Sequence, residues 1–247
     1  MNGNSALLTF AVFAVACSDA TKGEALGSGR YVISTTIFQP DGQTSLVTLL
    51  DDPALASTLD TERAIEIGGS AALFGADGRS VFAIGSSDAP VVTRYEVSSR
   101  GELSERARMS LEGTGISSAF KRPELVPFVS DTKAYWLDDT SAQAVVWNPE
   151  EMTLTGQFSL AAAERESYLL ELGEAVLRDG LLFVSGQYRT VDEGEAGRAL
   201  ALVIDTQSDA LLDVVTDDRC GGTMEIAPAD DGTLYFARDA FSASLHA

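Results

Sequence analysis

Short runs of alternating apolar and polar residues, bounded by turn residues, recur along the whole chain. Such alternation is typical of β-strands that bury one face. Five runs begin alike: "GRYVISTT", "GRSVFAIGS", "TKAYWLDD", "GLLFVSGQ" and "GTLYFARD". Their first residues are Gly29, Gly78, Thr132, Gly180 and Gly232, separated by 49, 54, 48 and 52 residues. A repeat of about fifty residues indicates a solenoid or a propeller.

The residue before four of these runs is an aspartate: Asp77, Asp131, Asp179 and Asp231. Asp-Gly between two apolar runs predicts a two-residue hairpin turn, because glycine accepts the positive φ that this turn needs. The strands expected before these turns are "AALFGA", "LVPFVS", "EAVLR" and "MEIAPA". Helical signal is almost absent, and only "AAAERESYLL" suggests a turn or two of helix.

A third and a fourth strand are expected after each complete hairpin. The third strands are "SLVTLL", "VVTRYEV", "AVVWN" and "LALVID", and the fourth are more polar, such as "TLTGQFSL". Four antiparallel strands with the outermost the most polar describe the blade of a β-propeller. A β-sandwich could also hold short strands, but it would not keep this four-strand repeat. The predicted fold is therefore an all-β propeller of four-stranded antiparallel blades.

The number of repeats bears on the size of the ring. From Gly29 onward the sequence holds four repeats and the first hairpin of a fifth, about 4.5 blades in all. Propellers close their ring so that no blade edge stays unpaired. We therefore expect a fragment of a larger propeller, incomplete at its C-terminus, with about seven blades in the whole ring.

The N-terminus predicts a processing signal. Residues 6–16 form an apolar run of eleven, which is too short for a transmembrane helix and suits a signal peptide. The run ends in "AVAC", which resembles a bacterial lipobox with Cys17 as the lipidated residue. We expect residues 1–17 to be a signal peptide, 18–28 a linker and 29–247 the propeller. An ordinary cleaved signal peptide and an apolar N-terminal strand with an incidental cysteine are the alternatives.

The second cysteine leaves a related question open. If Cys17 is acylated, Cys220 has no partner within the chain, whereas a disulfide between the two would exclude the lipid anchor. The expected location is the cell envelope, at the periplasmic face of the outer membrane or the cell surface. Ser18 after the cysteine, rather than aspartate, favours the outer membrane.

The net charge of the chain limits the kinds of partner that it can bind. The chain has 37 acidic and 17 basic side chains and a formal net charge of −20, which repels phosphate backbones and anionic lipids. We expect no nucleic-acid partner and contact with the membrane only through the lipid anchor. The expected partner is another protein or a small anionic ligand.

Residues for common catalytic chemistry are scarce. The single histidine is His246, and P-loop, Cys-x-x-Cys and dinucleotide-binding motifs are absent from the sequence. We predict no catalytic residue, no cofactor and no metal site. Paired aspartates such as Asp138 and Asp139 could offer oxygens to calcium, but their spacing matches no known calcium loop, and aspartate also favours hairpin turns.

Basic and aromatic residues in the predicted loops of one propeller face form a candidate ligand site. Propeller loops of this kind surround the channel mouth, and a cationic ring on an acidic protein would suit an anionic ligand. The candidates are Lys121, Arg122, Arg165, Tyr188, Arg189 and Arg219. Ordinary solvated loop charges are the alternative explanation.

Several segments, among them "SSDAPVVTRYEVSSRGEL", "SDTKAYWLDDTSAQAVVWNPEEMTLTGQ", "VIDTQSDALL" and "DDGTLYFARDAFSA", carry a family resemblance. The chain resembles the MxcI-type proteins of myxobacteria, lipoprotein-like propellers associated with a siderophore locus. The resemblance implies a role in the envelope near iron-siderophore uptake. The leading hypothesis is thus a lipid-anchored propeller that binds or scaffolds. The rival is a propeller enzyme, lactonase-like or quinoprotein-like, with its active site at the channel mouth.

Overall fold

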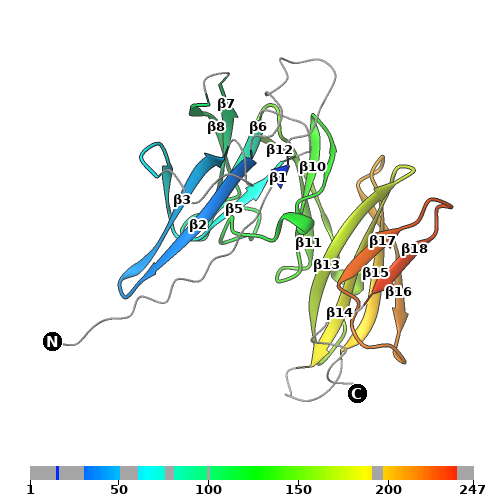
Figure 1. Cartoon of the computed structure of the whole chain (residues 1–247). Coiled ribbons are helices and arrows are strands. Elements are labelled where there is room, and N and C mark those ends of the chain that lie inside the picture. The colour runs from blue at the N-terminus through cyan, green and yellow to red at the C-terminus, as the bar shows by residue number, and fades with distance from the viewer. Residues whose placement is uncertain are drawn as a thin grey trace. The chain divides into compact units, whose positions relative to one another are not determined.

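Antiparallel strands make up nearly all of the computed structural model of the chain (Figure 1). The structure describes residues 15–16, 31–50, 61–75, 81–98, 101–190 and 197–237. These residues divide into two compact units, residues 1–123 and residues 124–247. The all-β prediction is confirmed, and each unit is described by itself below.

Unit 1 holds two four-stranded sheets in which strands adjacent in sequence are adjacent in the sheet. This meander is the topology of a propeller blade. Blade 1 consists of β1 (Val15–Ala16), β2 (Tyr31–Gln39), β3 (Gly42–Leu50) and β4 (Ile65–Gly68). Blade 2 consists of β5 (Ala71–Phe74), β6 (Val81–Ser86), β7 (Val91–Val97) and β8 (Leu103–Ser110).

The two blades of unit 1 pack through a shared apolar core. Val32 and Val47 of blade 1 contact a cluster that includes Leu73 and Ile84 of blade 2, all of them buried. Ser45 Oγ accepts a hydrogen bond from Ala71 N and donates one to Gly69 O, both at 2.9 Å, so the buried polar side chain is satisfied at the passage between blades.

Strand β1 falls inside the segment predicted to be a signal peptide. Its two residues pair antiparallel with Tyr31 and Val32 of β2. Cys17, Gly29 and Gly78 lie outside the described residues, so the predictions made at those positions stay predictions.

Unit 2 holds two more four-stranded meanders and a hairpin. Blade 3 consists of β9 (Phe128–Ser130), β10 (Lys133–Asp138), β11 (Gln143–Asn148) and β12 (Thr153–Ser159). Blade 4 consists of β13 (Tyr168–Arg178), β14 (Leu181–Thr190), β15 (Arg198–Asp205) and β16 (Ala210–Asp217). The hairpin is β17 (Glu225–Pro228) with β18 (Leu234–Ala237), the expected start of a fifth repeat. Each four-strand repeat thus forms a blade, as predicted.

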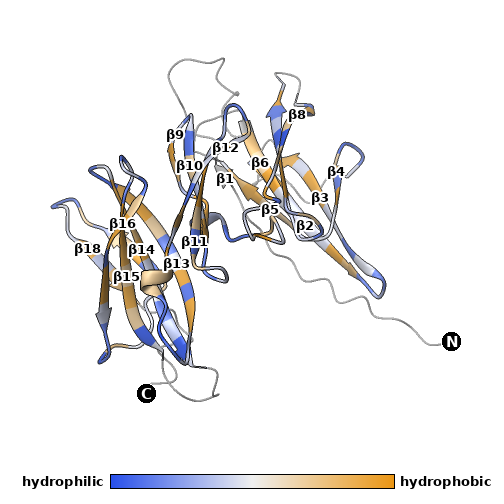
Figure 2. Ribbon diagram, turned by 180° about the vertical axis from the view of Figure 1, so that it is seen from behind, coloured by the Kyte–Doolittle hydropathy of each residue, from blue (hydrophilic) through white to orange (hydrophobic). Residues whose placement is uncertain are grey.

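A single core joins blades 3 and 4. Tyr135 and Val146 from blade 3 and Leu182, Val184 and Leu202 from blade 4 belong to one buried cluster. Burying each such side chain contributes about 1.5–3 kcal/mol. Figure 2 shows apolar residues mainly along the strands and polar residues mainly in the turns, as expected for strands that pack into a core.

The hairpin turns confirm one prediction and correct another. Asp179 (φ 50°) and Gly180 (φ 79°) link Arg178 to its partner Leu181 in the predicted two-residue turn. At Gly232 the two-residue turn is wrong, because the pair between Pro228 and Leu234 leaves a five-residue loop. This loop is closed by Gly232 N, which donates to Ala229 O, and by Thr233 N, which donates to Asp231 Oδ1, both at 2.9 Å.

The expected turn or two of helix within residues 161–170 is present as one short turn. Residues 161–170 begin with a short 3-10 helix, η2 (Ala161–Ala163), but Tyr168 already starts β13. A second short 3-10 helix, η1 (Pro123–Leu125), precedes blade 3. The apolar "YLL" segment pairs along β14, so cross-strand packing outweighs local helix preference.

Candidate functional site

One end of blade 4 collects arginines from every strand of the sheet. In an antiparallel sheet the starts of β13 and β15 and the ends of β14 and β16 lie together. Arg165 precedes β13, Arg189 is near the end of β14, Arg198 begins β15 and Arg219 follows β16. We call this the arginine end.

The concentration of guanidinium groups is specific to this end. The described residues of unit 2 include six basic side chains: Lys133, Arg165, Arg178, Arg189, Arg198 and Arg219. Four of the six belong to the arginine end. Acidic side chains lie at both ends of blade 4: Glu171, Asp217 and Asp218 at the arginine end, and Asp179, Asp205 and Asp209 in or beside the turns of the opposite end.

Arg165 is held from two sides. Its Nη1 and Nη2 lie 2.6 Å and 3.3 Å from Oδ1 and Oδ2 of Asp218, a two-pronged ion pair. Its guanidinium carbon lies 4.9 Å from the ring centre of Tyr168 and 5.6 Å from that of Tyr188. The two rings meet edge to face with centres 6.0 Å apart. The carboxylate and both rings therefore fix the orientation of this guanidinium.

Tyr188 supports the site from inside the protein. Its side chain is 3% exposed and belongs to the core cluster of blades 3 and 4. Burial raises the pKa of the Tyr188 phenol, and the nearby Arg165 charge opposes that rise. At 3% exposure the ring acts as a wall behind Arg165 and not as a surface for a ligand.

Asp218 carries its negative charge firmly. The hydrogen bonds from Arg165 lower the pKa of the Asp218 carboxyl, and the charges of Arg165 and Arg198 lower it further. The position of this carboxylate is thus one where the protein favours negative charge.

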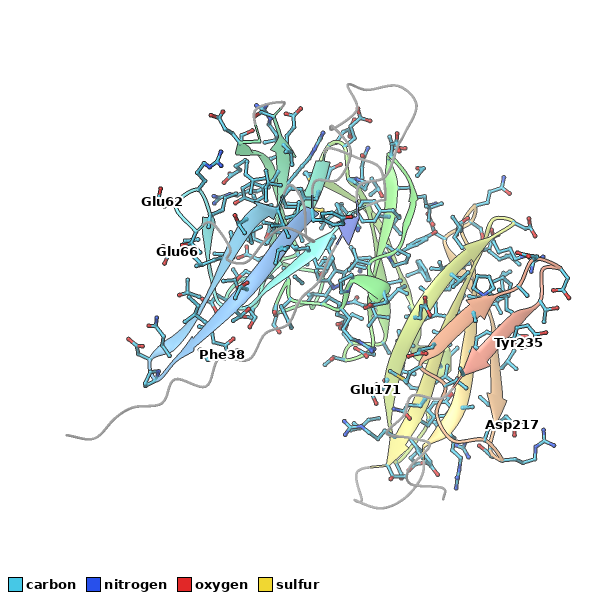
Figure 3. All side chains as sticks on the ribbon, viewed as in Figure 1. Phe38, Glu62, Glu66, Glu171, Asp217 and Tyr235 are labelled. Carbon is cyan, nitrogen blue, oxygen red and sulfur yellow. The ribbon has the colours of Figure 1, made fainter. Side chains whose placement is uncertain are left out.

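Arg189 is oriented through a buried amide. Gln187 Nε2 donates to Glu171 Oε2 at 2.7 Å, and Arg189 Nε lies 3.5 Å from the same oxygen. The amide lies close to two glycines: a Cβ on Gly222 would lie 2.5 Å from Gln187 Cβ, and one on Gly197 would lie 2.6 Å from Gln187 Oε1. Figure 3 labels Glu171 on β13.

Arg219 pairs with its own turn. Asp217, labelled in Figure 3, accepts hydrogen bonds from Arg219 N at 2.9 Å, Nε at 3.0 Å and Nη2 at 2.8 Å. These bonds lower the pKa of the Asp217 carboxyl. Cys220 is an exposed free thiol whose Sγ lies 3.8 Å from Asp217 Oδ2.

The structure brings together four of the six residues that the sequence analysis selected: Arg165, Tyr188, Arg189 and Arg219. Lys121 and Arg122 belong to unit 1, in the segment that follows β8. Tyr188 and Arg189 lie on β14 and not in the loop that was expected to hold them.

Four residues of the arginine end were missed by the sequence analysis: Tyr168, Glu171, Arg198 and Asp218. Arg198 could have been found as the residue that opens the third strand. The other three matter only through cross-strand neighbours, and no local signal marks them.

The chemical capacity of the arginine end is anion binding. A guanidinium has five N–H donors, and Asp218 occupies two of those of Arg165. The side chains of Arg165, Arg189 and Arg219 are 38%, 59% and 89% exposed, so each guanidinium is partly open to solvent, although each also contacts a carboxylate of the chain: Asp218, Glu171 or Asp217. Within the described residues no group of three or more histidine, cysteine or acidic side chains is placed to hold a metal ion.

Comparisons with known proteins leave the family open. No protein-family model matches the chain, and no curated protein matches it. The solved structures that are similar in part include two at low sequence identity. One is the dihydro-heme d1 dehydrogenase NirN in complex with DHE, with 12% identity, a TM-score of 0.43 and coverage of 76% of this chain and 35% of that chain.

The other is the α-L-arabinofuranosidase PaAbf62A from Podospora anserina in complex with cellotriose. It has 9% identity and a TM-score of 0.38, with coverage of 89% of this chain and 82% of that chain. The chain thus spans about a third of the NirN structure, and both TM-scores are below 0.5, so neither likeness bears on function. In the described part of the chain, no helix has the length and apolar character to span a bilayer.

Proposed function

We propose that this chain is an extracytoplasmic β-propeller that acts by binding, and that its ligand is a small anion held at the arginine end. The observation that carries the proposal is the gathering of Arg165, Arg189, Arg198 and Arg219 at one end of one sheet. The chain as a whole has a net charge of −20, so a local cluster of guanidinium groups offers an anion a selective place to bind.

The wider setting belongs to the same proposal. The lipobox-like end of residues 6–17 supports a lipid anchor at Cys17 in the bacterial cell envelope. The resemblance to MxcI-type proteins supports a link to iron-siderophore uptake, and a ferric catecholate is an anion of the right kind. The four-strand repeats support a ring of about seven blades in the whole protein.

Titration of the purified protein with a ferric catecholate at several salt concentrations tests the proposal. We expect saturable binding that weakens as salt rises, because guanidinium-anion attraction is screened. Arg189→Gln and Arg219→Gln should each weaken binding about tenfold, the equivalent of ~1.4 kcal/mol.

The matched control is Arg178→Gln, which removes an arginine from the opposite end of the same blade. It should leave the affinity unchanged. Binding that is absent, or that falls equally in all three variants, would contradict a ligand site at the arginine end.

A further inference from the structure

We propose that Asp218 occupies the position beside Arg165 where the ligand binds, and that a carboxylate of the ligand displaces Asp218 from Arg165. The inference rests on the proposed function and concerns anions that carry a carboxylate; a ferric catecholate carries none and tests only the anion site itself. The carrying observation is the two-pronged ion pair between Arg165 and Asp218, with N···O distances of 2.6 and 3.3 Å. The planar Asp218 carboxylate already fits the two N–H groups of Arg165, so this ion pair has the geometry that a ligand carboxylate would adopt.

The two partners differ in how firmly they are held. Arg165 lies against the rings of Tyr168 and Tyr188, and Tyr188 is part of the buried core. Asp218 lies in the turn after β16, its side chain is 58% exposed, and both hydrogen bonds that the described residues give its carboxylate come from Arg165. The arginine therefore stays in place when the carboxylate leaves.

The neighbouring Asp217 is bound more firmly to its arginine than Asp218 is to Arg165. It accepts three hydrogen bonds from Arg219, one of them from the Arg219 backbone N–H, and its side chain is 34% exposed. Releasing Asp217 would undo the turn itself. Displacement is therefore specific to Asp218.

Electrostatics favours an incoming anion at the vacated position. The charges of Arg165 and Arg198 both lower the pKa of Asp218, while the charge of the neighbouring Asp217 opposes them, and the net effect at this position favours a negative charge. When Asp218 swings into solvent, that stabilisation becomes available to a ligand carboxylate. Displacing an exposed ion pair reduces ligand affinity only modestly, because such pairs contribute little in water.

Isothermal titration calorimetry with citrate at constant ionic strength tests the inference, with sulfate as the tetrahedral comparison. We expect Asp218→Asn to bind citrate about two- to fivefold more tightly than the wild type, since the competing carboxylate is gone. Asp213→Asn is the matched control. It removes the same charge from exposed β16, where Asp213 Oδ1 accepts only a local hydrogen bond from Val214 N at 2.8 Å.

The outcomes separate this inference from the proposed function. Equal citrate affinity in Asp218→Asn and Asp213→Asn would overturn displacement, while wild-type binding of a ferric catecholate would still support the proposed function. An equal gain for sulfate and citrate would overturn the carboxylate class. Failure of Asp218→Asn to bind citrate at all would overturn the inference, and the ferric catecholate titration then decides the proposed function by itself. Asp218→Ser serves as a second variant, and circular dichroism checks that each variant folds.

Discussion

Replacing Tyr135 with phenylalanine removes a single hydroxyl from the interior of unit 2. Tyr135 is fully buried in the core of blades 3 and 4, and its hydroxyl donates to Asp209 Oδ1 in the turn between β15 and β16. Lys133 Nζ lies 2.7 Å from the same oxygen and donates to Thr206 O at 2.6 Å. The hydroxyl thus ties a strand of blade 3 to a turn of blade 4.

The expected loss in the free energy of unfolding is about 1–2 kcal/mol. A hydrogen bond to a charged acceptor contributes about 1.5–3 kcal/mol. The Asp209 side chain is 34% exposed and keeps Lys133, so water and the ammonium group offset part of the loss. The phenylalanine ring still fills the site and keeps the edge-to-face contact with Phe158, whose ring centre lies 5.9 Å away. Because no cavity forms, the substitution has no further cost in the free energy of unfolding from a cavity.

The same hydroxyl gives unfolding a dependence on alkaline pH. Burial, together with the hydrogen bond to Asp209 and its charge, raises the pKa of Tyr135 above its ordinary value of 10.0. Above pH 10.0 this phenol ionises in the unfolded chain but stays protonated in the folded chain. The stabilisation that the phenol gives the folded state is therefore complete below pH 10.0 and is lost as the pH rises above 10.0. Tyr135→Phe should flatten the decline of stability above pH 10.0.

Urea unfolding followed by tryptophan fluorescence measures both effects. The two tryptophans of the chain, Trp136 and Trp147, are fully buried in blade 3, so the signal reports on unit 2. Tyr235→Phe is the control, because that side chain is 59% exposed and should change stability by less than about 0.5 kcal/mol. Equal stabilities of the two variants would refute the role of the Tyr135 hydroxyl.

Three further changes test the packing, a turn and the anchor. Gly173→Ala should cost about 1–3 kcal/mol in urea unfolding, because the new Cβ would lie 2.4 Å from Met224 O. Gly156→Ala on β12, where a Cβ makes only ordinary contacts, should cost much less, and equal costs would argue against this packing of β13. Gly180→Ala should cost about 1–2 kcal/mol, since φ is 79° there, and Gly180→Asn should recover part of that loss in the same assay. Cys17→Ala should abolish incorporation of a fatty-acid analogue into the protein in cells, and equal labelling of wild type and variant would contradict the proposed lipid anchor.

The strands and most turns of the blades could be predicted from short stretches of sequence. The short apolar runs in residues 133–138 and 181–190 predict strands, and the Asp179–Gly180 pair predicts the turn that joins β13 and β14. These features depend on residues close in sequence, where the side-chain period and the φ preference of glycine operate directly. The same logic fails at Gly232, where a longer loop is closed by bonds from Gly232 N to Ala229 O and from Thr233 N to Asp231 Oδ1.

The sequence alone determined the all-β class, the four-strand repeat, the acidic balance and most of the arginines that meet at one end of blade 4. Only the tertiary structure decided what those arginines touch. Arg165 and Asp218 are 53 positions apart in the chain, and Tyr135 and Asp209 are 74 apart. Neither pair has a local signature, because the register of the strands and the packing of one blade on the next bring these atoms together. The position of Tyr188 could likewise not be predicted from the sequence. Its place in a ligand-binding loop was an inference from composition, whereas the pleat of β14 turns its ring into the core behind Arg165.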